Sequence, residues 1–267
     1  MATQNARTME PWRTAIVSAK ENSIRIHGYD IAELMQRATF TDTVFLLHRG
    51  RLPNAAETRL LNAILISGAD HGANAPSCAT ARLAASGNRQ SLSAAVAAGI
   101  LTIGDEHGGA GSICMEMIAA GLERCSAESI SVAESAARTV AEARAQGKRV
   151  PGLGHRLHST DPRVAVLFGM AREAGLPTAG AEFMLALEAE VTARVKALPI
   201  NVDGALAAVL YDMGFPPEAG KLLFIVSRVA GLTAEVAEEY AREKPMRIRI
   251  PLEYDGVQPR TMPDTTE

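Results

Sequence analysis

Three histidines of this chain stand in glycine-flanked turns, and a fourth turn of this kind carries a carboxylate. The histidines are His71, His107 and His155, and the acid is Asp203 in the sequence Asn-Val-Asp-Gly. Glycine beside a histidine leaves the imidazole open to backbone and substrate. Each residue alone would be an ordinary turn residue, but half of the six histidines are placed in this way. The pattern predicts an acid–base site.

The neighbouring residues indicate what such a site would bind. His71 and His107 stand at or just before expected helix starts, where backbone N–H groups and the helix dipole favour anions and keep an imidazole neutral. A neutral imidazole can donate to an oxygen that gains negative charge. Taken alone, Asp203 would be a helix N-cap, worth roughly 1 kcal/mol. Arginine forks suit carboxylates held by two hydrogen bonds. Three arginines accompany these segments: Arg156, Arg163 and Arg228.

Other site chemistries find little support in the sequence. The three histidines form no HxxxH or HExxH pair, and no CxxC pair occurs, so we expect no metal. There is no GxSxG elbow, GxGxxG or GxxxxGK[ST] motif, so neither a serine nucleophile nor a bound nucleotide is indicated. Cys78, Cys114 and Cys125 are interpreted as small buried residues in a reducing compartment.

Composition favours a helical protein. The 267 residues are 47% hydrophobic but only 4% aromatic, which suits helices packed on small side chains. The net charge of -3, without long runs of like charge, indicates neither a nucleic-acid nor a membrane partner. The start has no apolar secretory segment, and no apolar run is long enough to cross a bilayer. We therefore expect a cytoplasmic protein.

The elements that must position the site residues are mostly helices. A hairpin is expected over 13–27, an extended piece over 247–254, and a hinge at the loop 147–154. One domain is expected over 13–256, with a small lobe at roughly 150–240 and disordered tails over 1–12 and 257–267. The expected helices cover 30–37, 40–48, 55–67, 72–86, 90–101, 110–122, 127–146, 161–174, 179–197, 203–213 and 217–242.

The ordered segments resemble the citrate synthase superfamily, most closely its short branch, the citryl-CoA lyase module at the carboxyl end of ATP-citrate lyase. Between the Leu-Pro and Ala-Asp-His segments lie only residues 54–68, as in that module, whereas full-length synthases carry roughly a hundred more residues there. The resemblance implies a mostly α, citrate-synthase-like multi-helical fold with a short N-terminal hairpin. The matching segments are 22–31, 45–53, 69–72, 99–109, 150–156 with 161–163, 201–204 and 227–228.

The resemblance also implies roles for individual residues. Asp203 matches the catalytic base, His107 the histidine that hydrogen-bonds the thioester oxygen, and His155 the histidine of the oxaloacetate carbonyl or citryl hydroxyl. His71, Arg163 and Arg228 match carboxylate binders, with Arg156 beside them. Arg249 matches an arginine that reaches the neighbouring subunit's site. The implied CoA-binding residues are Lys148, Arg149, Val150, Gly152, Leu153, Gly154 and His158.

The resemblance implies citryl-CoA cleavage to acetyl-CoA and oxaloacetate by retro-Claisen chemistry, with the CoA thioester as substrate and no permanent cofactor or metal. The short length and Arg156 are lyase-like, but His107 is synthase-like, so the net direction stays open. Alternatives are a citrate or related 2-oxo acid synthase that hydrolyses the thioester, and a catalytically silent CoA- or carboxylate-binding partner subunit. A homodimer or tetramer is expected, with the Ala-rich runs 72–86 and 90–101 at the subunit interface, and citrate activation is left to a separate enzyme.

Overall fold

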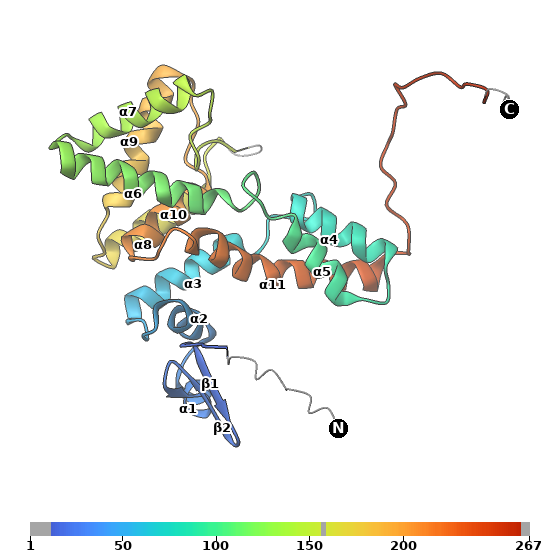
Figure 1. Cartoon of the computed structure of the whole chain (residues 1–267), viewed down its shortest axis with the longest axis horizontal. Coiled ribbons are helices and arrows are strands. Elements are labelled where there is room, and N and C mark those ends of the chain that lie inside the picture. The colour runs from blue at the N-terminus through green and yellow to red at the C-terminus, as the bar shows by residue number, and fades with distance from the viewer. Residues whose placement is uncertain (1–11, 156–158, 263–267) are drawn as a thin grey trace, which may run out of the picture.

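The computed structural model of this chain describes residues 12–155 and 159–262. Within them lie eleven α-helices and one small antiparallel sheet of three strands (Figure 1). The strands are β1 (Val17–Lys20), β2 (Ser23–Ile26) and β3 (Tyr29–Asp30), and β2 pairs with both of the others. The helices are α1 (Ile31–Arg37), α2 (Phe40–Arg49), α3 (Ala55–Ala69), α4 (Pro76–Gly87), α5 (Leu92–Leu101), α6 (Ala110–Glu128), α7 (Val132–Ala145), α8 (Pro162–Glu173), α9 (Ala179–Arg194), α10 (Val202–Asp212) and α11 (Ala219–Arg242).

The mostly helical fold expected from the sequence is confirmed, but several boundaries were wrong. The helix expected from residue 72 begins at Pro76, because residues 70–75 form a turn in which the Asp70 carboxylate accepts from the Gly72 N–H at 2.5 Å. The interruption between two helices that was expected between 122 and 127 lies instead at 129–131. There Ser129 takes a left-handed conformation and Ser131 caps α7. The hairpin also has a third strand, β3, that the pattern did not predict.

Helix caps explain many of the observed boundaries. Asn54 and Glu57 form a reciprocal capping box at the start of α3, and Thr39 with Asp42 does the same for α2. Asp161 caps α8, whose first residue is Pro162. At these helix starts, a polar residue at the end of the loop therefore satisfies free N–H groups of the next helix.

Most of the buried hydrophobic side chains among the described residues belong to two clusters. The larger cluster joins α2, α3 and α6 through α10 with the first half of α11. The smaller cluster lies between α4, α5 and the second half of α11, where Ala81, Ala85 and Ala95 pack against Leu232 and Val236. Helix α11 thus connects both clusters, with α4 and α5 at its far end (Figure 1). These three alanines of the runs expected at a subunit interface are used within the chain, where their small side chains let the helices approach closely, whereas Ala79, Ala94 and Ala97 on the same helices are exposed.

An exposed C-terminal arm follows α11. The piece 247–254 was expected to close the fold, but it forms no strand within the described residues and extends away from α4 and α5 (Figure 1). Ile250, Leu252 and Tyr254 on this arm are 73%, 92% and 73% exposed. We use "C-terminal arm" for residues 247–262.

Candidate active site

His107 is held by a tight loop between α5 and α6. The His107 N–H donates to the Gly104 carbonyl at 3.0 Å, and the Gly104 N–H donates to the His107 carbonyl at 3.1 Å. The imidazole meets the start of α4, where the backbone N–H of Ser77 donates to Nε2 at 3.2 Å and the Ser77 hydroxyl lies 2.9 Å from the same nitrogen. A backbone N–H can only donate, so Nε2 is the acceptor and the neutral ring carries its proton on Nδ1. The helix start that contacts this histidine therefore belongs to α4, although the sequence pointed to the helix that follows His107.

Ser77 also connects His107 to an arginine of α11. Arg228 is only 2% exposed, and its Nη1 donates to the Ser77 hydroxyl at 3.3 Å. Its Nε donates to the Gly68 carbonyl at the end of α3, at 2.9 Å. The guanidinium lies over the Phe224 ring, 5.0 Å from the centroid. The guanidinium of Arg228 and the imidazole of His107 therefore contact the same serine hydroxyl.

The loop that carries His155 is fastened to the segment that leads into α10. The Gly154 N–H donates to the Pro199 carbonyl at 2.7 Å, and the Asn201 N–H donates to the Gly152 carbonyl at 3.0 Å. The Asn201 side chain donates to the Gly154 carbonyl at 2.8 Å, and its amide oxygen caps α10 by accepting from the Gly204 N–H at 3.1 Å. Asn201 is therefore the N-cap, and the interpretation of Asp203 as a plain cap is wrong. Asp203 lies inside the first turn of α10.

The contact between this loop and α10 requires two glycines. Gly152 has φ +80°, and a Cβ placed on it would lie 2.8 Å from the Gly204 Cα and 2.8 Å from the Cys114 sulfur. A Cβ on Gly204 would lie 2.4 Å from the Gly152 carbonyl oxygen. Such separations are below normal contact distances, so both residues must lack a side chain. Gly152, three residues before His155, and Gly204, directly after Asp203, thus bring the two segments into direct backbone contact.

Asp203 lies in a partly buried, positively charged environment. Burial raises the pKa of the Asp203 carboxyl above its usual value, the charges of Arg163 and Arg228 act in the opposite direction, and Asp161 adds to the increase. A carboxyl with a raised pKa is a better match for proton exchange with a weakly acidic group such as a thioester α-carbon. The arrangement therefore suits Asp203 to move a proton.

Arg163 is oriented by Asp161. The Arg163 side chain donates to both carboxylate oxygens, from Nε at 2.9 Å and from Nη2 at 2.7 Å, and its Nη1 donates to the Ser67 carbonyl at 3.1 Å. Burial alone would raise the pKa of Asp161, but the hydrogen bonds and charge of Arg163, and the nearby His155, lower it below its usual value. With Arg228 on the Gly68 carbonyl, two guanidinium groups thus converge on the last turn of α3.

The predicted site residues divide into three groups. His71 and His155 lie with ring centroids 5.2 Å apart, and the contacts above bring them near the same region as His107 and Asp203. Arg249 is exposed on the C-terminal arm, and this arm extends away from α4 and α5 (Figure 1). Arg156 and His158 lie outside the described residues. The sequence interpretation gave no role to Ser77; only the proline before it, which begins α4, marks the position of its N–H.

The segment proposed for CoA is exposed at its basic end. Lys148 and Arg149 are exposed, whereas Val150 and Leu153 pack against the larger hydrophobic cluster. The backbone of Gly152 and Gly154 is already bonded to the segment before α10. The loop is therefore anchored at one end, and its two cations face solvent.

One group of possible metal ligands occurs among the described residues. One ligand atom each of Asp70, Cys78 and Glu235 lies within 4.8 Å of the others. Positive charge is already present there, because Arg82 pairs with Glu235 at 2.5 Å and Arg228 lies 3.8 Å from the Cys78 sulfur. Burial, followed by the charge of Asp70, raises the pKa of the Cys78 thiol. A metal ion would compete with two arginines and with the thiol proton.

Comparison with known proteins places the chain in a family. The domain described as "Citrate synthase, C-terminal domain" matches residues 6–59 and 53–249. The chain belongs to the citrate synthase family. It is 31% identical to a citrate synthase of Haloferax volcanii over 228 residues, covering 83% of this chain and 57% of the relative. It is also 31% identical to a 2-methylcitrate synthase of Shewanella oneidensis, covering 80% of this chain and 55% of the relative, so the chain spans little more than half the length of these relatives.

Solved structures resemble the chain along nearly its whole length. A citryl-CoA lyase from Hydrogenobacter thermophilus superimposes with a TM-score of 0.85 at 35% identity and covers 95% of this chain and 98% of its own. An ATP citrate lyase variant of Methanosaeta concilii, solved with (3S)-citryl-CoA, gives a TM-score of 0.74 at 22% identity and covers 93% of this chain but 43% of its own. The second likeness concerns the fold alone. The first extends over both chains from end to end.

Proposed function

We propose that this protein cleaves citryl-CoA to acetyl-CoA and oxaloacetate. The observation that carries the proposal is the joint placement of Asp203, with its raised pKa, and His107, whose proton is directed to Nδ1 by Ser77. The end-to-end similarity to the Hydrogenobacter thermophilus lyase supports the same reading. Arg163 and Arg228 add two guanidinium groups for the carboxylates of the substrate.

The proposed reaction moves one proton from the substrate hydroxyl to a carbon. His155 accepts the proton of the citryl hydroxyl, the oxygen becomes the carbonyl of oxaloacetate, and the bond to the thioester α-carbon breaks. The electron pair forms the enolate of acetyl-CoA, whose oxygen accepts a hydrogen bond from His107 Nδ1–H. Asp203, whose raised pKa favours its protonated form, returns a proton to the enolate carbon, and the proton held by His155 then passes through solvent to the Asp203 carboxylate, which restores both groups. No metal is needed for any of these steps, and Lys148, Arg149, His158 and the backbone of 150–154 are assigned to CoA.

A paired assay tests the proposal. Purified protein is given citryl-CoA, with oxaloacetate detected through malate dehydrogenase, and separately acetyl-CoA plus oxaloacetate, with free CoA thiol detected. Oxaloacetate release without thiol release supports the lyase. Thiol release from the second mixture supports a synthase that hydrolyses the thioester, an alternative favoured by the synthase relatives.

The silent-subunit alternative has a different test. Asp203→Ala should abolish cleavage if the protein is the catalyst, and unchanged activity would contradict the catalytic assignment. A protein without either activity that still binds CoA would be a binding partner subunit.

A lyase of this kind would receive citryl-CoA from a separate citrate-activating enzyme. We place it in the cytoplasm, consistent with three free cysteines; no helix among the described residues has the length and apolar character needed to span a membrane.

We further propose that Arg249 serves the site of a second copy in a homodimer, or in a tetramer of dimers. From Arg228 to Arg242, α11 rises about 21 Å at roughly 1.5 Å per residue, and the arm then leads away from its own chain (Figure 1). Alternate arm residues Ile248, Ile250, Leu252 and Tyr254 are apolar, the pattern of an extended segment with one buried face. In this chain Ile250, Leu252 and Tyr254 are exposed and Ile248 is half-buried, so we assign this face to a second copy.

Mixing inactive variants tests this shared site. As homo-oligomers, Asp203→Ala chains are expected to be nearly inactive, and Arg249→Ala chains to lose most of their activity at low citryl-CoA while keeping kcat and KM values that can be measured at high citryl-CoA. If Arg249 acts on the partner's site, a hybrid dimer contains one intact site, and an equal mixture recovers about a quarter of wild-type activity. No recovery after confirmed subunit exchange would show that Arg249 does not complete the partner's site.

A further inference from the structure

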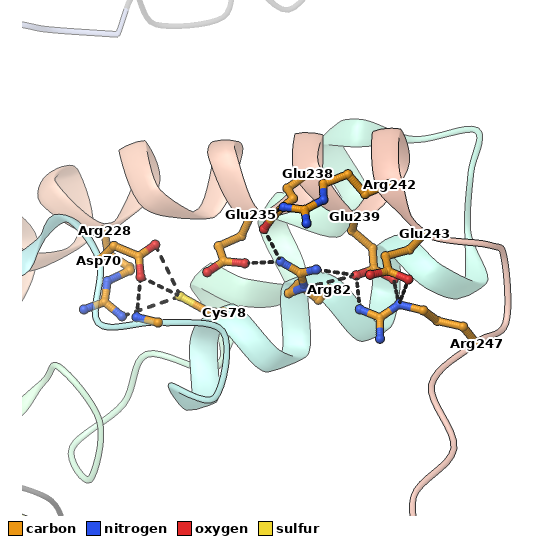
Figure 2. Close-up of polar contacts among 11 residues, drawn as sticks. Asp70, Cys78, Arg82, Arg228, Glu235, Glu238, Glu239, Arg242, Glu243 and Arg247 are labelled. Atoms are coloured by element: carbon orange, nitrogen blue, oxygen red, sulfur yellow. Dashed lines mark hydrogen bonds and ion pairs between the residues drawn. The ribbon is translucent and has the colours of Figure 1, made fainter.

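We infer that Glu239 is a positioning residue for Arg249, acting through the base of the C-terminal arm; this inference rests on the proposed role of Arg249. Glu239 lies on α11 and its side chain is fully buried. It accepts hydrogen bonds from two arginines of different segments: Arg82 of α4 at 3.0 Å, and Arg247 at the start of the arm at 2.9 and 2.5 Å (Figure 2). One buried carboxylate therefore joins α4, α11 and the arm.

The remaining contacts at this point hold the base of the arm in one direction. The Met246 N–H donates to the Ser86 carbonyl of α4 at 3.0 Å, and Met246 itself has φ +57°. Arg89 donates to the carbonyls of Glu239 and Glu243, at 3.0 and 2.8 Å. After Met246, no backbone hydrogen bond joins the arm to another segment in the part of the chain that the structure describes. The direction of the arm is therefore set within residues 243–247, two residues before Arg249.

The charges around Glu239 explain why its carboxylate is important. Arg82 also pairs with Glu235 at 2.5 Å and with Glu238 at 2.8 Å, so it has other acceptors if Glu239 loses its charge. The only other acid paired with Arg247 among the described residues is Glu243, at 3.0 Å, and that side chain is 35% exposed. Loss of the buried charge would thus release Arg247 and the arm more than it would release α4.

The network of charges around Glu239 offers a matched control. Glu238 belongs to the same network, bonded to Arg82 and Arg242, but its side chain is 41% exposed and does not contact the arm (Figure 2). Glu239→Gln and Glu238→Gln make the same chemical change on adjacent residues. Only the first variant should disturb Arg249.

Kinetics in a double-mutant cycle test the inference. Glu239→Gln should raise KM for citryl-CoA about tenfold with a smaller change in kcat, whereas Glu238→Gln should leave both near wild type. In an Arg249→Ala background, Glu239→Gln should have no further effect, because the residue that it positions is gone. Equal effects in both backgrounds would overturn the positioning role. Wild-type kinetics of Arg249→Ala would instead contradict the proposed function of Arg249.

A distance measurement tests the same inference without activity. A spin label at Glu253→Cys, in a Cys125→Ser background that leaves only the buried Cys78 and Cys114, reports the distance between the two arms of a dimer. Wild type and Glu238→Gln should give one narrow distribution, and Glu239→Gln a broad one. An unchanged narrow distribution in Glu239→Gln would show that the arm is held by other contacts. Arg247→Gln, which leaves Glu239 paired with Arg82, should broaden the distribution in the same way.

Discussion

The contact between the His155 loop and α10 is the most direct target for a test. In Gly152→Ala, the new Cβ would lie 2.8 Å from both the Cys114 sulfur and the Gly204 Cα, neither of which belongs to a flexible side-chain end. The residue would also have to keep φ +80°. Gly147→Ala is the matched control, because Gly147 has φ +65° in the same loop and its Cβ would have no neighbour within 4 Å among the described residues.

The two variants separate backbone strain from crowding. A left-handed conformation costs a non-glycine residue roughly 1–2 kcal/mol, and that is the whole expected loss in Gly147→Ala. Gly152→Ala adds the cost of an overpacked interior, typically about 1–3 kcal/mol, for a total of about 2–5 kcal/mol. In a chain of this size each 1 kcal/mol lowers Tm by about 2–4 °C, so the expected decreases are roughly 2–8 °C and 4–20 °C.

Calorimetry and the cleavage assay together measure both effects. Since Gly204 follows Asp203, displacement of α10 by Gly152→Ala should also lower kcat at temperatures where the protein is folded. Gly147→Ala should retain wild-type kcat. Equal Tm values for the two variants, with wild-type kcat in both, would refute the tight backbone contact on which this reasoning depends.

Three other predictions follow from the same structure. Ser77→Ala keeps the backbone N–H that donates to His107 but loses the hydroxyl. Because one hydrogen bond is worth roughly 0.5–1.5 kcal/mol, kcat in steady-state kinetics should fall about 2- to 12-fold. An unchanged kcat would contradict the role of the hydroxyl. Burial raises the pKa of Asp212 to about 6, so the stability contributed by its protonated form is complete below about pH 4 and is lost as the pH rises through 6. The Tm of Asp212→Asn minus that of wild type should therefore increase between about pH 4 and 7.5. A Tm difference that does not change with pH would contradict this prediction. Cys125 is partly exposed and should react with a thiol reagent in the folded protein. Burial raises the pKa of the Cys114 thiol and should protect it until the protein unfolds. Equal modification rates of Cys125 and Cys114, measured by mass spectrometry, would contradict this burial.

Local pattern predicted the helices well because each one is specified by its own residues. Apolar periodicity and caps such as Asn54 and Asp161 act within one turn of the chain, so they can be read without knowledge of tertiary contacts. The boundaries that were wrong lie where short-range competition decided them. Asp70 holds a turn that delays α4 to Pro76, and the Ser129–Ser131 turn shifts the end of α6.

The arm shows a different limit of sequence reasoning. The sequence predicted an extended piece that closes the fold, but no strand forms over 247–254, and no local rule says which surface receives its apolar side chains. The structure shows instead where the arm is fastened, at the buried Glu239 and Arg247 pair. That pair joins residues whose charges are unremarkable in a sequence with many exposed Glu and Arg side chains.

The sequence by itself determined the helical class, the glycine-flanked histidines and the carboxylate of Asp203, because these depend on residue type and short spacing. Only the tertiary structure decided how they cooperate. Ser77 directs the proton of His107 although thirty positions separate them, and Asn201 takes the capping role that would otherwise belong to Asp203. The physical reason is that a tautomer, a buried charge and a backbone contact between two glycines depend on groups that become neighbours only when distant segments pack together.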